Sequence, residues 1–329
     1  MIAINQTVLL FAPDGGAFRS SAGRQRHLTL VSLLPEVMDV TPERLVVCAS
    51  HSPGKERDVE HAFGHRFRSA LGAVAERAQQ FDPDMVVLFG GDHRRAFRHV
   101  VPAFGVALSA SILAEGGHPA GELDVPSESA RRLCEHLLSA GFDVAACRDI
   151  GLDHAFAQPI RDLFGDLAVK AVIPVPVNCA TAPLPTGRRV AEFGAEVCRF
   201  LDGLDERVLV IGTGGLSHSP PSLEVDTYDL SDEERARIIA EGMAEARTKI
   251  RPDWDAEVLD AMSNWDVAAL IRLVDTAHAR AGAGANEVRT WLAAGAAGGG
   301  QPVTPLAYEP VPEWITGMAV AASASSTTC

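Results

Sequence analysis

The sequence predicts an α/β fold: a single domain with a central mixed sheet flanked by helices, and with its functional site at the carboxyl ends of the strands. Short runs rich in β-branched residues alternate with stretches of helical periodicity. Several of these runs end in a polar loop that carries a histidine. No repeat is present, and no linker long enough to mark a domain boundary occurs before residue 310, so one domain is the simpler organisation.

The two ends of the chain are expected to lie outside this domain. Residues 1–40 mix Gly, Ser and Arg without a sustained period, and we interpret them as a leader that is disordered or not part of the native core. The folded domain is assigned to residues 41–320, and residues 321–329 to a flexible tail.

The first regular unit is predicted to be a strand, a helix and a second strand. Residues 44–50 and 85–89 are short apolar runs, which is typical of buried strands. Between them, residues 59–80 carry apolar side chains at helical spacing. The first strand runs directly into His51, and the second continues as GGDH to His93.

The alternation continues, and the last third of the chain is predicted to be mostly helical. Residues 171–177 resemble a strand in spite of their prolines, which indicate a sheet edge or a strand end. Residues 208–211 are the clearest short buried strand and run directly into GTGGLSHSPP. The other expected elements are a small-residue apolar segment at 104–113, helices at 128–139 and 190–201, a strand at 142–147, and helices at 232–249, 256–262, 267–278 and 287–297.

Composition excludes some classes of function. The 329 residues include 29 basic and 43 acidic side chains, and the net charge of −14 would repel nucleic-acid phosphates and anionic lipids. We therefore expect no nucleic-acid and no membrane partner. No stretch approaches the roughly 20 apolar residues that a bilayer-spanning helix needs. The six cysteines show no C-x-x-C spacing, which favours reduced thiols in a cytoplasmic protein.

Histidines occupy equivalent places in the predicted topology. His51, His93 and His218 each lie just beyond the carboxyl end of a strand, where open α/β sheets bind ligands. One such histidine is more often a solvated loop residue, but three together favour a shared site. His154, in GLDHAFAQP, is a fourth candidate because the adjacent Asp153 could orient an imidazole. A histidine that caps a turn is the alternative interpretation.

These residue types suit a divalent metal ion. A site for divalent iron typically combines two imidazoles and one carboxylate, which leaves other positions open for substrate and oxygen. Local spacing cannot select one carboxylate among 43 acidic residues. Glu287 is a candidate because it ends a glycine-rich turn at a helix start, where stabilisation of the first helical turn is the commoner role.

The glycine-rich segment at residues 212–217 matches two familiar motifs only weakly. Ser217 replaces the third glycine of a dinucleotide-binding fingerprint, and the G-x-S-x-G pattern of serine hydrolases is absent. We interpret these glycines as allowing the backbone to come close to a bound planar ligand.

Seven motifs occur in order along most of the chain: ASHSP at 49–53, DH at 92–93, AGELDVP at 120–126, GLDHAFAQP at 151–159, GTGGLSHSPP at 212–221, NEVRTW at 286–291 and VPEWITG at 311–317. The series resembles the class III extradiol ring-cleavage dioxygenases, and GLDHAFAQP and GGLSHSPP are its most specific members.

The resemblance implies a mononuclear non-haem Fe(II) site. His51 and His93 match the metal histidines, Glu287 matches the metal carboxylate, His154 matches the proton donor and His218 the proton acceptor. The implied reaction is extradiol (meta) cleavage of a catechol by dioxygen, giving a muconic semialdehyde-type product. The implied substrate resembles 2,3-dihydroxyphenylpropionate or another 3-substituted catechol, and the resemblance also implies a homo-oligomer.

The residues after His93 depart from the family pattern. Arg94 and Arg95 stand where the relative used for comparison has aromatic residues. Either could bind a substrate carboxylate bidentately if it faces the pocket, and two solvated surface arginines are an equally good interpretation.

Two other functions are compatible with the motifs. The fold could serve as a non-enzymatic protein or peptide binding module, or the same ligands could hold zinc in a metallohydrolase. A binding module has no need of an acid, a base and a metal-ligand set together.

Overall fold

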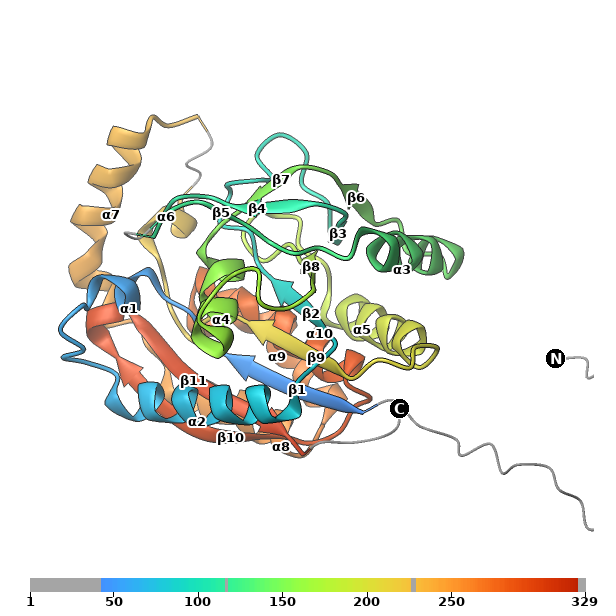
Figure 1. Cartoon of the computed structure of the whole chain (residues 1–329). Helices are drawn as coiled ribbons and strands as arrows, with labels where there is room; N and C mark the ends of the chain where they lie inside the picture. Colours follow the sequence, from blue (N-terminus) through green and yellow to red (C-terminus); the bar gives the residue numbers. More distant parts are fainter. Residues whose placement is uncertain (1–42, 116–117, 226–228, 325–329) are drawn as a thin grey trace, which may run out of the picture. The chain divides into compact units, whose positions relative to one another are not determined.

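Six strands form the main sheet of the protein, which a computed structural model describes over residues 43–115, 118–225 and 229–324 (Figure 1). The predicted leader at residues 1–40 and residues 325–329 of the predicted tail lie outside the described residues. In order across the sheet, the strands are β10 (Val303–Val311), β11 (Thr316–Ser323), β1 (Arg44–Ala49), β9 (Val208–Thr213), β2 (Met85–Gly90) and β8 (Val172–Pro176).

The sheet is mixed, as predicted. β1, β9, β2 and β8 pair in parallel, whereas β11 is antiparallel to both β1 and β10. The parallel strands are continuous apolar runs because both of their faces are covered. Their shared direction brings all four carboxyl ends to one edge of the sheet.

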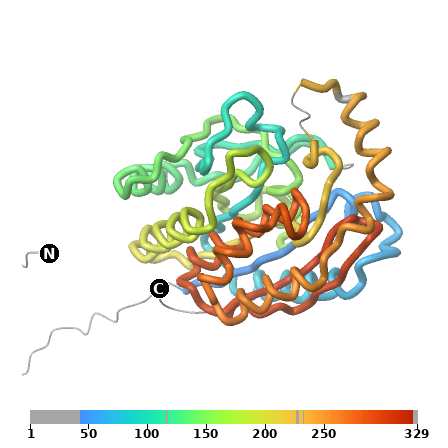
Figure 2. Tube along the Cα trace, turned by 180° about the vertical axis from the view of Figure 1, so that it is seen from behind, coloured from blue at the N-terminus to red at the C-terminus, as the bar shows by residue number. Residues whose placement is uncertain are grey.

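Helices cover both faces of this sheet. Alternate residues of β1 point to opposite faces and pack against different helices. Leu45 and Val47 pack with α2 (His65–Phe81) and α4 (His154–Phe164), which lie in front of the sheet in Figure 1. Val46 and Cys48 join the core on the other side, seen from behind in Figure 2. The helices of that side are α5 (Gly187–Leu201), α8 (Pro252–Ser263), α9 (Val267–Ala281) and α10 (Val288–Ala297).

Smaller elements surround this core. Two short sheets, β3–β6 and β5–β4–β7, lie above the main sheet in Figure 1. The remaining elements are α1 (Pro53–Arg57), β3 (Gly105–Ala107), β4 (Ala110–Ile112), β5 (Gly121–Glu122), α3 (Ser127–Ser139), β6 (Ala145–Cys147), β7 (Ile150–Leu152), α6 (Pro221–Glu224), α7 (Asp232–Ala246), and the short 3-10 helices η1 (Ala283–Glu287) and η2 (Pro312–Trp314).

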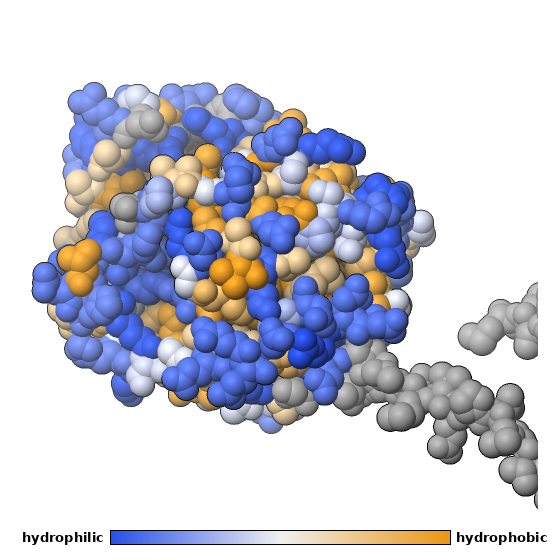
Figure 3. Space-filling view, in the orientation of Figure 1, coloured by the Kyte–Doolittle hydropathy of each residue, from blue (hydrophilic) through white to orange (hydrophobic). Residues whose placement is uncertain are grey.

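On the face of the molecule shown in Figure 3, hydrophilic side chains dominate and apolar ones gather mainly near the middle. None of the described helices has the length and apolar character needed to cross a bilayer.

Several elements agree with the sequence prediction. β8 contains Pro174 and Pro176 and forms one edge of the main sheet, where a missing backbone N–H is tolerated. The helix predicted at 190–201 is observed as α5, which begins three residues earlier because the Thr186 side chain caps it. The helix predicted from residue 59 begins only at His65, and Val59 is 77% exposed.

The end of the chain differs from the prediction. β10 and β11 were not expected in a mostly helical last third. β10 contains Pro305 and Pro310, which an edge strand accepts, and β11 consists mainly of small residues with little strand signal of their own. A tail beginning at residue 321 is wrong for 321–323, because Ala321 and Ala322 are buried and paired with β1.

The cysteine prediction is confirmed for four residues. Cys48, Cys134, Cys147 and Cys179 are free thiols. It is wrong for Cys198, which is disulfide-bonded.

Phe193 tests the core behind the sheet. Its ring is fully buried and stacks on Phe104, with 4.1 Å between ring centroids. We expect Phe193→Ala to lower the free energy of unfolding by about 3–5 kcal/mol, because it leaves a cavity in a closed cluster. Phe63, which is 41% exposed, is the matched control, and Phe63→Ala should change stability by no more than about 0.5 kcal/mol. Urea unfolding followed by circular dichroism measures both, and equal losses would contradict this description of the core.

Candidate active site

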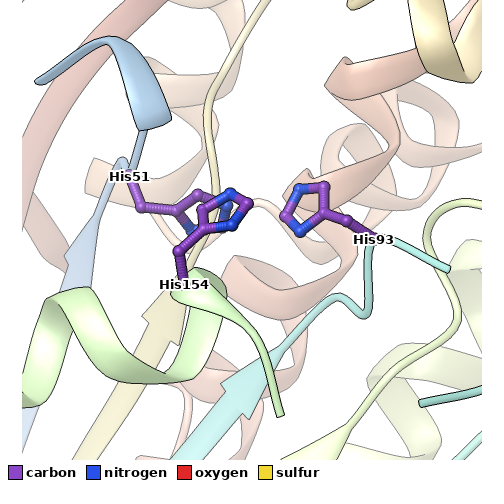
Figure 4. A group of neighbouring side chains, drawn as sticks. All are labelled: His51, His93 and His154. Atoms are coloured by element: carbon purple, nitrogen blue, oxygen red, sulfur yellow. The ribbon is translucent and has the colours of Figure 1, made fainter. Parts of the chain in front are cut away.

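Three imidazoles meet at the carboxyl edge of the parallel strands (Figure 4). His51 follows β1, His93 follows β2, and His154 is the first residue of α4. The ring centroid of His51 lies 5.2 Å from each of the other two, and the rings of His93 and His154 stack at 4.4 Å. One ring nitrogen of each lies within 4.8 Å of those of the others, so this group could hold a metal ion.

Glu287 is the carboxylate that joins these histidines. It is 3% exposed, and its Oε1 lies 2.9 Å from Nε2 of His93 and 3.5 Å from Nε2 of His51. Its Oε2 accepts a hydrogen bond of 2.7 Å from the backbone N–H of Gly215. The Glu287 side chain makes no capping hydrogen bond to α10. Its hydrogen bonds therefore do not support the alternative role of stabilising the first turn of that helix.

Glycines make room for this arrangement. A Cβ on Gly214 would lie 2.5 Å from Cβ of Glu287, and the residue has a φ of +154°. A Cβ on Gly284 would lie 2.3 Å from the imidazole of His218. The glycines of residues 212–217 were predicted to admit a planar ligand, but Gly214 admits the Glu287 side chain instead.

Fixed partners orient the two strand-end histidines. Nδ1 of His51 lies 2.8 Å from the hydroxyl oxygen of Thr213 at the end of β9. Nδ1 of His93 lies 3.1 Å from the carboxylate of Asp153. Asp153 also accepts a hydrogen bond from the backbone N–H of Ala155 and thereby caps α4. Both histidines therefore turn Nε2 toward Glu287.

His218 lies close to the other oxygen of Glu287. Its Nδ1 lies 3.0 Å from the carbonyl oxygen of Leu216, so that this nitrogen donates and Nε2 is left as the acceptor. Nε2 lies 3.8 Å from Oε2 of Glu287. Burial lowers the pKa of His218, which favours the neutral imidazole.

His154 is held by an acid that the sequence analysis missed. Its Nδ1 donates to Oε2 of Glu115 at 2.8 Å, and its Nε2 is buried without a hydrogen-bond partner in the described part of the chain. Burial opposes ionisation of Glu115, but the bond to His154 lowers its pKa to about 2. A fixed negative charge at Nδ1 keeps the proton on that nitrogen and leaves Nε2 facing the other imidazoles.

The electrostatics of the site favour a positive charge between Glu287 and the histidines. Burial lowers the pKa of His51 to about 4, so this imidazole is neutral and its Nε2 lone pair is free. Burial opposes a charge on His93 as well, but Asp153 and Glu287 raise its pKa well above the ordinary value. Burial also opposes ionisation of Glu287, yet His51 and His93 hold its pKa well below the ordinary value.

A cavity of about 270 Å³ opens onto these groups. His51, His93, His154 and His218 all line it. Its other walls come from α1, α6, α7 and the turn between β10 and β11.

Arg94 and Arg95 both line the cavity, but each is engaged within the chain. The guanidinium of Arg94 donates to the carbonyl oxygens of Ser222, Val225 and Ala180. Arg95 donates to Oε1 of Glu115 at 3.2 Å. Both therefore lie at the cavity with their guanidinium groups bound by the protein itself.

Comparison with known proteins identifies the family. The model for the catalytic LigB subunit of aromatic ring-opening dioxygenases matches residues 45–319. The chain belongs to this family. It is an extradiol ring-cleavage enzyme, as the motifs predicted, and the alternative of a non-enzymatic binding module is set aside.

Several relatives of this dioxygenase share one name. A protein of Mycobacterium sp. (strain MCS), named 2,3-dihydroxyphenylpropionate/2,3-dihydroxicinnamic acid 1,2-dioxygenase, is 37% identical over 83% of this chain and 96% of its own. The protein of that name from Photorhabdus laumondii subsp. laumondii is 33% identical over 84% and 95%. A Pseudomonas putida protein named as form 1 of this enzyme is 34% identical over 82% and 95%. The motifs predicted a likeness to this group, and the comparison confirms it.

The donor set of the dioxygenase fits the metal on which its family depends. Nε2 of His51 is a buried atom without a hydrogen-bond partner in the described part of the chain. The Glu287 carboxylate supplies the negative charge that offsets a buried cation. Imidazole and carboxylate together suit a first-row divalent ion.

The loop that carries His218 in this dioxygenase is fixed by a second buried carboxylate. Asp255 of α8 is fully buried and accepts bonds of 2.7 Å from the backbone N–H and the hydroxyl of Ser217 and from the hydroxyl of Tyr308. Burial outweighs these bonds and raises the pKa of Asp255 to about 6. No motif pointed to Asp255, because it lies on a helix 38 residues from its partner Ser217.

Glu115 should matter to catalysis without mattering to metal binding. We expect Glu115→Gln to lower kcat about 10–100-fold, because the amide no longer fixes the His154 proton, while the metal content per chain stays the same. Steady-state kinetics and metal analysis of the purified variant measure this. Glu313→Gln, at an exposed glutamate of the same cavity, is the matched control. An unchanged kcat in Glu115→Gln, or an equal loss in both variants, would contradict the role of Glu115.

Asp255 should make stability depend on pH. Its pKa of about 6 lies above the ordinary value of 3.8, so the folded state holds this proton more tightly than the unfolded state does. The free energy of unfolding should therefore fall as pH rises from 4 to 7, by roughly 2–3 kcal/mol from this group. Asp255→Asn removes the contribution, so the difference in stability between variant and parent should change by that amount across the range. Parallel urea-unfolding curves at both pH values would argue against it.

Proposed function

We propose that this protein is an Fe(II)-dependent extradiol dioxygenase that acts on 2,3-dihydroxyphenylpropionate or a closely related 3-substituted catechol, and forms a muconic semialdehyde-type product. The observation that carries the proposal is the convergence of Nε2 of His51, Nε2 of His93 and Oε1 of Glu287 beside a cavity that two further histidines line. The names of the relatives support the substrate class.

His51, His93 and Glu287 are the proposed metal ligands. Two ligand atoms about 2.1 Å from one ion, at right angles to each other, lie about 3 Å apart. The distances of 2.9 and 3.5 Å from Glu287 to the two imidazoles are close to this value. The ring planes of His51 and His93 cross at 79°, so their in-plane lone pairs can converge on one point.

His154 fits a ligand role less well than a proton-transfer role. Its ring stacks on that of His93 with 20° between the planes. Lone pairs lie in the plane of an imidazole ring, so those of two stacked rings run side by side and do not converge on one ion. Two histidines and one carboxylate also leave one face of a metal ion open.

Fe(II) in this site would supply the Lewis acidity that makes a catechol hydroxyl more acidic, and the redox centre through which ring electrons reach dioxygen. The protein's own residues handle the protons. Nε2 of His218 is the free acceptor of a neutral imidazole, and we assign it the removal of a proton from a substrate hydroxyl.

His154 is assigned the opposite role. With Nδ1–H bound to the Glu115 carboxylate, the ring of His154 presents Nε2 to the site, and we assign this nitrogen the delivery of a proton. The ring bond beside the diol is broken, both oxygen atoms of O₂ enter the product, and the proton taken by His218 and the one given by His154 balance.

The cellular setting is part of the proposal. Four free thiols support a cytoplasmic location, whereas the disulfide of Cys198 does not. The resemblance to extradiol dioxygenases supports a homo-oligomer, which size-exclusion chromatography with light scattering measures.

Reconstitution with Fe(II) tests the function. The protein is loaded with Fe(II) under argon, mixed with 2,3-dihydroxyphenylpropionate and other catechols, and exposed to air. We expect one O₂ consumed per catechol and a yellow ring-fission product, both abolished by an iron chelator. Stoichiometric zinc without oxygen uptake would favour the metallohydrolase alternative and overturn the proposal.

Histidine variants separate metal binding from proton transfer. His51→Ala should no longer retain iron through gel filtration. His218→Ala should retain iron but lose about 10²–10⁴-fold in kcat/KM, since an acid–base group is removed. His65→Ala, at an exposed position on α2, is the matched control and should match the parent. Equal loss of iron in His51→Ala and His218→Ala would contradict the division of roles.

A further inference from the structure

The cavity is lined by more basic than acidic side chains, although the chain as a whole has a negative net charge. Its lining includes four arginines, Arg57, Arg94, Arg95 and Arg235, against two glutamates, Glu115 and Glu313. The whole chain has a net charge of −14. An arginine-rich cavity in such a chain is suited to an anionic ligand.

Most of this charge is already used within the chain. Arg94 donates to three backbone carbonyls through its two terminal nitrogens. Arg95 pairs with Glu115, the residue that orients His154. Arg235 on α7 also interacts with a neighbouring group.

Arg57 is different. It is the last residue of α1 and is exposed, and its guanidinium makes no hydrogen bond or ion pair with any described residue. Glu313, the exposed acid of the cavity wall, forms no ion pair with it among the described residues. Its charge and its five N–H donors are therefore available to a ligand.

The position of α1 gives Arg57 the right reach. The helix begins at Pro53, two residues after His51, and Arg57 lies about 6 Å further along its axis. Helix α1 lies below α7 in Figure 1. Residues of both helices line the cavity. A ligand whose reacting end lies at His51 could extend a short side chain toward Arg57.

The walls between these two points suit an apolar linker. Ile239 and Met243 lie four residues apart, on one side of α7, and both line the cavity. Trp314 and Ile315 line it from the turn between β10 and β11. Methylene groups and an aromatic ring pack favourably against such side chains.

We propose that Arg57 binds the side-chain carboxylate of the catechol substrate through a bidentate ion pair, and so selects aromatic acids over neutral catechols. The inference rests on the proposed function, because it places the diol of the substrate at His51, His93 and Glu287. It also moves the carboxylate site away from Arg94 and Arg95, which the sequence suggested.

The test compares two substrates in the iron-loaded enzyme. One is 2,3-dihydroxyphenylpropionate, and the other is 3-methylcatechol, which has no carboxylate. We expect Arg57→Ala to raise KM for the acid about 10–100-fold, as for a lost hydrogen-bonded ion pair, and to change KM for 3-methylcatechol less than about threefold. Arg57→Lys should recover part of the loss, since it keeps the charge but not the planar fork.

Arg66→Ala is the matched control, because Arg66 is an exposed arginine on α2 that does not line the cavity. It should leave both KM values unchanged, which separates a local contact from the effect of total charge. An unchanged KM for the acid in Arg57→Ala, or an equal rise for both substrates, would overturn the proposal. A parent enzyme that cleaves neither catechol would instead refute the proposed function.

Discussion

Glu287 places a negative charge in the interior of the protein, where only positive partners and hydrogen-bond donors can offset the loss of water. The surroundings provide both. The backbone N–H of Gly215 binds one oxygen, and two imidazoles approach the other. Gly214 has no side chain to obstruct this approach. The carboxylate thus draws together the loops after β1, β2 and β9, and the candidate site is assembled around a charge that also suits a metal ion.

A second layer of partners fixes these groups. Asp153 holds His93, Thr213 holds His51, and Glu115 holds His154. Each partner binds Nδ1 and leaves Nε2 for the site, so one arrangement is used three times. Asp255 fixes the loop that carries His218 by accepting a hydrogen bond from the backbone N–H of Ser217. These partners therefore fix the orientation of the imidazoles and of the loop on which the chemistry of the site depends.

The sequence was informative where function follows from local order. His51 and His93 come directly after apolar strands, and parallel strands bring their carboxyl ends together, so the grouping of these histidines could be predicted from periodicity. Glu287 could not be selected in this way, because nothing in its neighbourhood distinguishes it from other acids at helix starts. Only the family resemblance selected it.

Other features are determined by long-range packing and leave little local signal. Glu115 and Asp255 meet their partners across 39 and 38 residues. β10 and β11 form because β1 offers an unpaired edge, whereas their own prolines and small residues predict no strand. Arg94 follows His93 directly in the sequence, yet with a φ of +60° its guanidinium binds backbone carbonyls. The direction of its side chain could not be predicted from its place in the sequence.

The contrast between the cavity and the rest of the molecule affects how a charged substrate arrives. At long range, an anionic aromatic acid meets the field of a chain with a net charge of −14, and only near the arginines of the cavity does the potential favour it. Salt screens the long-range repulsion over about 8–10 Å, but it screens the attraction inside the enclosed cavity much less. Moderate ionic strength should therefore speed the capture of an acid substrate, the opposite of the usual behaviour of an enzyme with an electrostatically attractive surface.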